Sequence, residues 1–140
     1  MAIQQAAGVE LAARLHDAYN RRDREALLAC LADDVVWHVE GDNPAAGVYE
    51  GRERVWDEVF EPLWASPARV QDDELLEHGE HVIALQRALH NFGDGERSWR
   101  AVEIMRIAGG RVAARWEFTS DRASLDAMLQ RGCAAAPDVF

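Results

Sequence analysis

Lysine is absent from this sequence of 140 residues. All 15 basic residues are arginine, and they stand against 25 acidic residues, which gives a formal net charge of -10. A field of that sign repels phosphate backbones and anionic lipid. We therefore expect neither nucleic acid nor a membrane surface as a partner.

Cysteine and long apolar runs are also scarce. Cys30 lies in an apolar helical pattern and Cys133 in a small-residue tail, which forms neither a disulfide framework nor a metal-ligand spacing. Cys30 is expected to be a buried, inert thiol. No apolar run approaches the ~18 residues of a membrane helix, and residues 1–10 lack the layout of a signal peptide. These absences predict a cytoplasmic protein.

The chain does contain enough apolar material for a core, with 49% hydrophobic and 29% charged residues. No stretch rich in glycine, proline or serine separates it into two parts. We expect a single domain over residues 1–140, with its core at about residues 9–130.

Three helices are predicted in the first half of the chain. Apolar side chains recur at helical spacing between residues 9 and 22. Asp23 can cap a second helix over residues 24–32. A third helix has apolar side chains at i, i+4 spacing from Val55 to Leu63, and Pro62 should kink or end it.

Strands follow the second helix and dominate the second half. Residues 35–39 are β-branched and aromatic, and residues 69–77, 81–91, 98–108 and 111–119 are separated by turn signals at hairpin spacing. Ser120 or Asp121 can cap a last helix. The pattern predicts an α+β fold in which a curved antiparallel sheet wraps around three N-terminal helices and leaves a cone with an internal pocket.

The turn at residues 93–95 sets the register of the central hairpin. Pairing Phe92 with Arg97 places six further side chains on one face, in three pairs: His90 with Trp99, Ala88 with Ala101, and Gln86 with Glu103. Together with Trp37, this face offers aromatic walls and a few polar groups, as a small-molecule site requires. A slip of one residue would break the grouping.

Glu103 is the central candidate for chemistry. Inside an apolar wall its carboxylate would be desolvated, which raises its pKa and leaves it protonated as a hydrogen-bond donor or general acid. Two alternatives stay open: a structural ion pair with Arg115 or Arg87, and plain exposure at the surface.

Two histidines on strands are candidates for proton transfer. His38 could act as a general base opposite Glu103, and His90 could contact substrate or shuttle a proton. Strand alternation weighs against His38, because it faces outward if Trp37 faces the pocket, unless a bulge re-aims it. Otherwise each is a half-buried or satisfied core histidine.

Other polar clusters suggest no further chemistry. His78 and His81 flank a turn without a third ligand, so no metal is predicted, and no cofactor motif is present. The serines and cysteines lack the context of a nucleophile. Asp72, Asp73 and Glu74 are expected on a solvated face.

Residues 36–55, VWHVEGDNPAAGVYEGRERV, resemble the signature of the SnoaL-like polyketide cyclase group. That group belongs to the nuclear transport factor two and ketosteroid isomerase superfamily, whose order of helices and strands matches the one predicted here over about residues 9–130. The resemblance implies a cystatin-like roll. This fold hosts isomerases, cyclases, epoxide hydrolases, dehydratases and binding modules, so the resemblance alone selects no reaction.

The resemblance also assigns positions. Glu103 falls where ketosteroid isomerases carry the protonated aspartic acid of their oxyanion hole. The isomerase base falls at or beside Val39 and the isomerase tyrosine at Leu15, and both departures argue against steroid isomerisation. Glu40 stands where SnoaL-like sequences often have proline. Epoxide hydrolases of this superfamily use an Asp-Arg-Asp relay. For such a relay this sequence offers Arg115 and Glu103 but no clear second aspartate.

Residues and resemblance together predict a cofactor-independent enzyme that isomerises, cyclises or dehydrates a small hydrophobic carbonyl or polyketide-like molecule. The alternative is a non-catalytic small-molecule-binding or dimeric accessory module. The candidate catalytic residues are Glu103, His38 and His90. The candidate substrate-binding residues are Trp37, Glu40, Tyr19, Trp56, Phe60, Gln86, Trp99 and Arg115.

The outer sheet face is expected to form a homodimer. Apolar and basic side chains alternate there with the inward-facing ones, namely Leu85, Leu89, Val102 and Ile104 with Arg87, Arg100 and Arg106.

Overall fold

The computed structural model describes residues 6–66 and 68–130. The helices are α1 (Ala6–Arg21), α2 (Arg24–Ala29), α3 (Arg52–Val55), α4 (Glu61–Leu63) and α5 (Arg122–Met128), with a π-helical segment, Trp56–Phe60, between α3 and α4. The strands are β1 (Leu31–Val39), β2 (Gly47–Glu50), β3 (Arg69–His78), β4 (His81–Asn91), β5 (Glu96–Ala108) and β6 (Arg111–Thr119). Cys133 lies outside the described residues.

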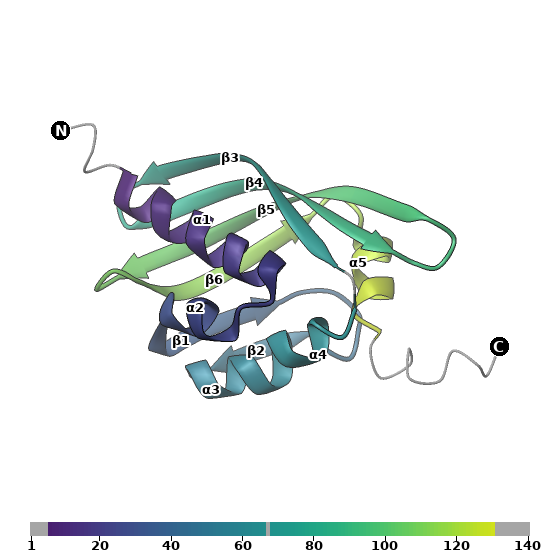
Figure 1. Ribbon diagram of the computed structural model, residues 1–140, viewed down its shortest axis with the longest axis horizontal. Coiled ribbons are helices and arrows are strands. Elements are labelled where there is room, and N and C mark those ends of the chain that lie inside the picture. The colour runs from purple at the N-terminus through teal and green to yellow at the C-terminus, as the bar shows by residue number, and fades with distance from the viewer. Residues whose placement is uncertain (1–5, 67, 131–140) are drawn as a thin grey trace.

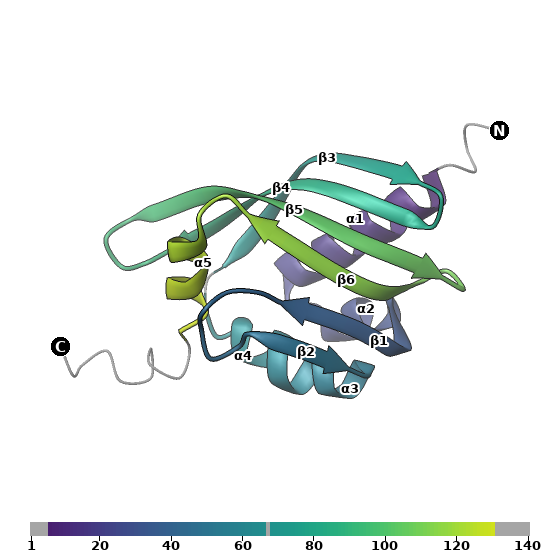
Figure 2. The same ribbon diagram turned by 180° about the vertical axis from the view of Figure 1, so that it is seen from behind.

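Six strands form one curved sheet in the order β2-β1-β6-β5-β4-β3 (Figure 2). The sheet is antiparallel except where β1 and β6 run parallel. The wholly antiparallel prediction is corrected at this one pair. Because three helical segments and four strands separate β1 from β6 along the chain, no hairpin constrains their relative direction.

The helices cover one face of the sheet (Figure 1). α1 lies across β3 and β4, and α3 packs against β1 and β2. The predicted α+β fold, with a curved sheet wrapped around N-terminal helices, is therefore confirmed. Within the described ranges, no helix is long and apolar enough to cross a membrane.

Local signals begin and end most elements where the sequence indicated. The Asp23 carboxylate accepts a hydrogen bond from the Ala26 amide at 3.1 Å and caps α2. α2 ends three residues earlier than predicted, at Ala29 rather than residue 32, because Leu31 already pairs with Val112 of β6. Asp121 caps α5 by accepting from the Ser124 amide at 3.0 Å.

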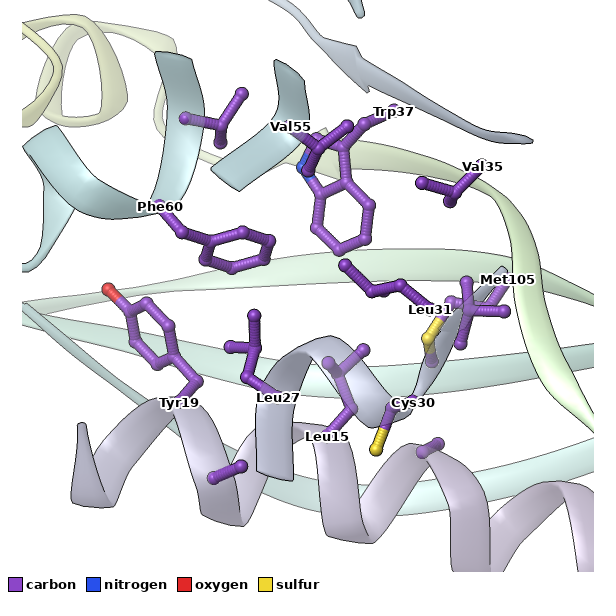
Figure 3. Close-up of a cluster of buried hydrophobic side chains, with 14 of the residues drawn as sticks. Leu15, Tyr19, Leu27, Cys30, Leu31, Val35, Trp37, Val55, Phe60 and Met105 are labelled. Atoms are coloured by element: carbon purple, nitrogen blue, oxygen red, sulfur yellow. The ribbon is translucent and has the colours of Figure 1, made fainter. Parts of the chain in front are cut away.

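The core lies between the helices and the concave face of the sheet (Figure 3). Its fully buried members come from α1, α2, α3 and four strands, which joins the two layers into one apolar cluster. They include Leu15, Leu27, Leu31, Val35, Val82, Met105 and Val112. Cys30 is buried in this cluster, as predicted, and burial raises the pKa of its thiol.

The register of the central hairpin differs from the predicted one by two residues. Asn91 pairs with Glu96, so Ala88 lies opposite Trp99 and Ala84 opposite Glu103. The turn causes the shift, because it is centred one residue earlier than predicted, on Gly93 and Asp94, with the Phe92 amide donating to the Gly95 carbonyl at 3.4 Å. Because a shift of two keeps the alternation of faces, the predicted inner-face group stays together and is buried: Gln86, Ala88, His90, Trp99, Ala101 and Glu103.

Candidate active site

A cavity opens between α1, the α3–α4 region, α5 and the inner face of the sheet. Aromatic rings form part of its wall: Phe60 lies edge-on to Trp37, with 5.0 Å between ring centroids, and 6.0 Å from Tyr19 (Figure 3). Aliphatic side chains complete the lining, among them Leu15, Val59, Leu63, Val70, Leu125, Met128 and Leu129. Such walls suit a small apolar ligand.

A line of charged side chains crosses one wall of this cavity. His16 Nδ1 lies 2.7 Å from an oxygen of Asp72, and Nε2 lies 2.6 Å from Oε1 of Glu103. Arg115 donates from Nε to Oε2 of Glu103 at 2.7 Å and from Nη2 to Glu117. The five groups therefore form one continuous network.

Two local features bring His16 and Asp72 together. His16 follows Ala12 by four residues on the buried stripe of α1, so its ring faces the sheet. β3 has a bulge at Asp73, since Asp72 pairs with Gln86 whereas Glu74 pairs with Leu85. Asp72 thereby faces the helix, and the prediction that it is solvated was wrong.

The network fixes the charge of its central members. Burial by itself lowers the pKa of His16, but the carboxylates of Glu103 and Asp72 outweigh it and raise that pKa to about 10. His16 is thus an imidazolium near neutral pH, and both ring nitrogens donate. Burial raises the pKa of Glu103, but the positive charges of His16 and Arg115 bring it down to about 2.

Glu103 is accordingly a carboxylate, and the prediction of a neutral acid was wrong. The alternative of an ion pair with Arg115 is confirmed, with His16 as a second partner. The prediction rested on the cost of burying the carboxylate. In the structure each of its oxygens contacts a cation, which compensates that cost.

Glu117 differs from Glu103 although both contact Arg115. Burial raises the pKa of Glu117, and the nearby carboxylates of Glu103 and Glu40 add to the rise, while Arg115 opposes it. Glu117 and Arg115 both line the cavity. The sequence offered no clear second aspartate beside Arg115, and in the structure a glutamate, Glu117, is the second acid there.

The Arg115 guanidinium contacts an aromatic ring and a backbone carbonyl in addition to the two carboxylates. Its guanidinium lies over the ring of Trp37 at 4.7 Å, and its Nη1 donates to the His38 carbonyl at 2.9 Å. Within the described chain, three of its five N–H groups have these carbonyl and carboxylate partners, which leaves two for a ligand in the cavity.

Seven of the predicted site residues line the cavity. They are Tyr19, Trp37, Glu40, Phe60, Gln86, Glu103 and Arg115. Among them, Glu40 accepts a hydrogen bond from the Thr119 amide at 3.1 Å, and Gln86 donates to Asp72 at 3.2 Å.

His38 lies on the other face of the sheet. It stacks on Trp116 with 5.1 Å between ring centroids, and its Nδ1 donates to the Arg115 carbonyl at 3.0 Å. Strand alternation places it there because Trp37 faces inward and no bulge intervenes between them. A role as general base opposite Glu103 is therefore contradicted by its position.

His90, Trp99 and Trp56 are buried but lie outside the cavity lining. His90 packs on Phe92 near the β4–β5 turn, at 4.4 Å between ring centroids. Burial, and then Arg97, lower the pKa of His90. Trp99 belongs to the same cluster, whereas Trp56 packs against Trp64 at 5.0 Å.

His16, Asp72, Glu117 and the α5 side chains of the lining were not among the predicted site residues. Two signals pointed to them. His16 lies four residues after Ala12 and three before Tyr19 on the buried stripe of α1, and Glu117 follows Arg115 by two residues on one strand.

Across residues 6–66 and 68–130, no three histidine, cysteine or acidic side chains gather as a metal site.

A sequence profile of the SnoaL-like domain matches residues 12–115. An uncharacterised protein of Mycobacterium tuberculosis, Rv0034, is 28% identical over 123 residues, which cover 86% of this chain and 94% of that protein. A protein of unknown function with a cystatin-like fold from Xanthomonas campestris superposes with a TM-score of 0.78 at 19% identity, over 86% of this chain and 96% of that one.

TerC, whose structure was determined with polyporic acid, superposes with a TM-score of 0.76 at 15% identity, over 89% of this chain and 98% of that one. These similarities concern the fold. Because the profile spans α1 to the middle of β6, including most of the cavity lining, this chain belongs to the SnoaL-like domain family.

Proposed function

We propose that this chain is a cofactor-independent acid/base enzyme acting on a small hydrophobic carbonyl compound or polyketide-like molecule. One observation carries the proposal. The guanidinium of Arg115 contacts two carboxyl groups, and one of them, Glu117, faces an apolar cavity with a raised pKa. A carboxyl group whose pKa is moved toward neutrality is suited to proton transfer.

In this mechanism Glu117 moves the proton. Its carboxylate form removes a proton from the carbon next to the substrate carbonyl, and the electron pair moves to the carbonyl oxygen. The two remaining N–H groups of Arg115 stabilise that oxyanion. Return of the proton to another carbon gives isomerisation, attack of the enolate on a second carbonyl gives cyclisation, and loss of a β-hydroxyl as water gives dehydration.

The apolar walls orient the substrate. Trp37, Phe60 and Tyr19 favour a flat, largely apolar molecule, and Glu40 and Gln86 are polar groups at the same wall. The structurally similar TerC was co-crystallised with polyporic acid, which supports ligand binding on this fold.

Exchange of substrate protons for deuterium tests the proposal. The wild type, Glu117→Gln and the exposed control Glu25→Gln are incubated in D2O with a panel of enolisable cyclic ketones, and the loss of α-proton signals is followed by NMR. Because the acid–arginine–acid arrangement also resembles an epoxide hydrolase relay, the panel includes an epoxide, whose opening is followed by the NMR signals of the diol. We expect Glu117→Gln to slow turnover about 100-fold or more and Glu25→Gln to leave it unchanged. Equal rates for wild type and Glu117→Gln would contradict the proposal.

A second candidate function is non-catalytic binding of the same class of molecule. The observation that favours it is the full pairing of Glu103, which holds that carboxyl as an ion and removes it as a general acid. Quenching of tryptophan fluorescence by the panel, without any exchange in the wild type, would support a binding module instead.

A further inference from the structure

His16 has no step of its own in the proposed chemistry, yet it is one of the most constrained side chains of the site. It is 7% exposed and contacts carboxylates from two different strands, Asp72 of β3 and Glu103 of β5. A buried imidazolium between two carboxylates is costly to desolvate, so its position calls for a functional reason.

The arrangement of Glu103 suggests that reason. Oε1 of Glu103 contacts His16 Nε2 at 2.6 Å, and Oε2 contacts Arg115 Nε at 2.7 Å. Carboxylates often bind arginine with both oxygens, but here only one is available. The Nη2 group of Arg115 therefore remains with Glu117 at the cavity wall.

We propose that His16, anchored by Asp72, is a positioning residue that occupies one oxygen of Glu103 and thereby keeps Nη2 of Arg115 directed at Glu117. The inference rests on the proposed function in assigning the proton-moving role to Glu117. Without His16, Glu103 rotates to bind Arg115 through both oxygens and draws Nη2 away from Glu117.

The surrounding charges strengthen this competition. The groups that face His16 and Glu103 come from every neighbouring strand: Asp72 on β3, Gln86 on β4, Arg115 and Glu117 on β6, and Glu40 at the end of β1. Two cations stand among four carboxyl groups. Removal of the imidazolium leaves Arg115 as the only cation in this group, for which Glu103 and Glu117 then compete.

The test follows the Glu117 carboxyl directly, so it needs no substrate. Carboxyl-carbon NMR titrations of the wild type, His16→Gln and Leu11→Val report the pKa of Glu117 in each. Leu11 is buried on the same helix but outside the cavity lining, so Leu11→Val is a matched control for loosened packing. We expect the pKa of Glu117 to rise in His16→Gln, because the positive charge of His16 is lost and Arg115 no longer opposes burial as strongly, and to stay unchanged in Leu11→Val.

Turnover supplies a second readout if the exchange assay detects activity. His16→Gln should lower kcat by about 10- to 100-fold with a smaller effect on KM. The reason is that the guanidinium of Arg115, which stabilises the transition state, is displaced in this variant. Asp72→Asn loosens the anchor of His16 but keeps its charge, so a rise in the pKa of Glu117 in this variant reports displacement of Arg115 rather than loss of the imidazolium.

An unchanged pKa of Glu117 in His16→Gln, or in Asp72→Asn, would overturn the positioning role. An equal rise in Leu11→Val would overturn it as well. Absence of any activity in the wild type bears on the proposed function alone, because the titration follows the Glu117 carboxyl without turnover.

Discussion

At the scale of single residues, neighbours decide the ionisation of this site more than residue type does. Glu103 and Glu117 lie on paired positions of β5 and β6 and contact the same guanidinium. Their pKa values nevertheless move in opposite directions. Glu103 has His16 as a second cation, whereas Glu117 has Glu103 and Glu40 as neighbouring carboxylates.

The raised pKa of His16 predicts a dependence of stability on pH. A histidine whose pKa rises from 6.5 to about 10 on folding contributes its full stabilisation below 6.5 and loses it as pH rises through about 10. We expect the free energy of unfolding, measured with urea, to fall over that range in the wild type.

His16→Gln should show a flatter pH profile than the wild type over the same range. Near neutral pH this variant should be less stable by about 3 to 5 kcal/mol, because it breaks a buried ion network. Wild-type and variant profiles that run parallel from neutral to alkaline pH would contradict the assigned charge of His16.

At the scale of elements, β3 holds α1 at three points along its length. Glu77 accepts from the Gly8 and Val9 amides at 3.2 and 3.3 Å, Asp72 accepts from His16 at 2.7 Å, and Asn20 donates to the Val70 carbonyl at 2.8 Å. The bulge at Asp73 allows both Asp72 and Glu77 to face the helix. A regular strand would turn one of them away.

α5 closes one end of the cavity and is attached by few contacts. The Asp126 carboxylate accepts from the Asp42 amide at 2.9 Å and from the Asn43 side chain at 2.8 Å. Leu125 and Leu129 pack with Ala45 in a small separate cluster. Gly41 is required beside this attachment, because its φ is +110° and a Cβ there would lie 2.3 Å from the Asp126 carboxylate.

Loss of this attachment should loosen α5 without unfolding the sheet. We expect Asp126→Ala to lower stability by about 1 kcal/mol and to speed amide hydrogen exchange in Arg122–Met128 relative to β4 and β5. Asp94→Ala, in the exposed β4–β5 turn, is the control and should leave the exchange of α5 unchanged. Equal protection of α5 in all three proteins would show that its apolar contacts alone hold it.

At the scale of the whole molecule, the two faces of the sheet differ in what covers them. Helices cover the inner face (Figure 1), whereas the outer face presents the large hydrophobic side chains that are most exposed. Phe118 is 53% exposed, Val48 50% and Leu76 43%. Apolar exposure on this face favours its association with another copy, against the mutual repulsion of two chains that each have a net charge of -10.

We propose that this face forms the homodimer expected from the sequence. Light scattering coupled to size-exclusion chromatography should give a dimer mass for the wild type. Phe118→Ser should weaken the dimer about tenfold or more, and Glu53→Ser, on α3 away from this face, should not. A monomeric wild type at high micromolar concentration would contradict the proposal.

Much of the fold was determined by the sequence itself, because its signals act between close neighbours. Caps at Asp23 and Asp121 and glycine turns begin and end elements within a few residues. Alternation along β4 and β5 selected the inner-face group even though the predicted register was wrong by two residues. These features depend on local geometry, which the order of residues specifies.

Only the tertiary structure decided which charges meet. His16 stands 56 residues from Asp72 and 87 from Glu103 along the chain, and it reaches them because α1 lies against a bulged β3. The pKa of a buried carboxyl depends on charges in space. For that reason the sequence located Glu103 and Arg115 on the inner face, whereas their ionisation, and the contrast between Glu103 and Glu117, followed from packing.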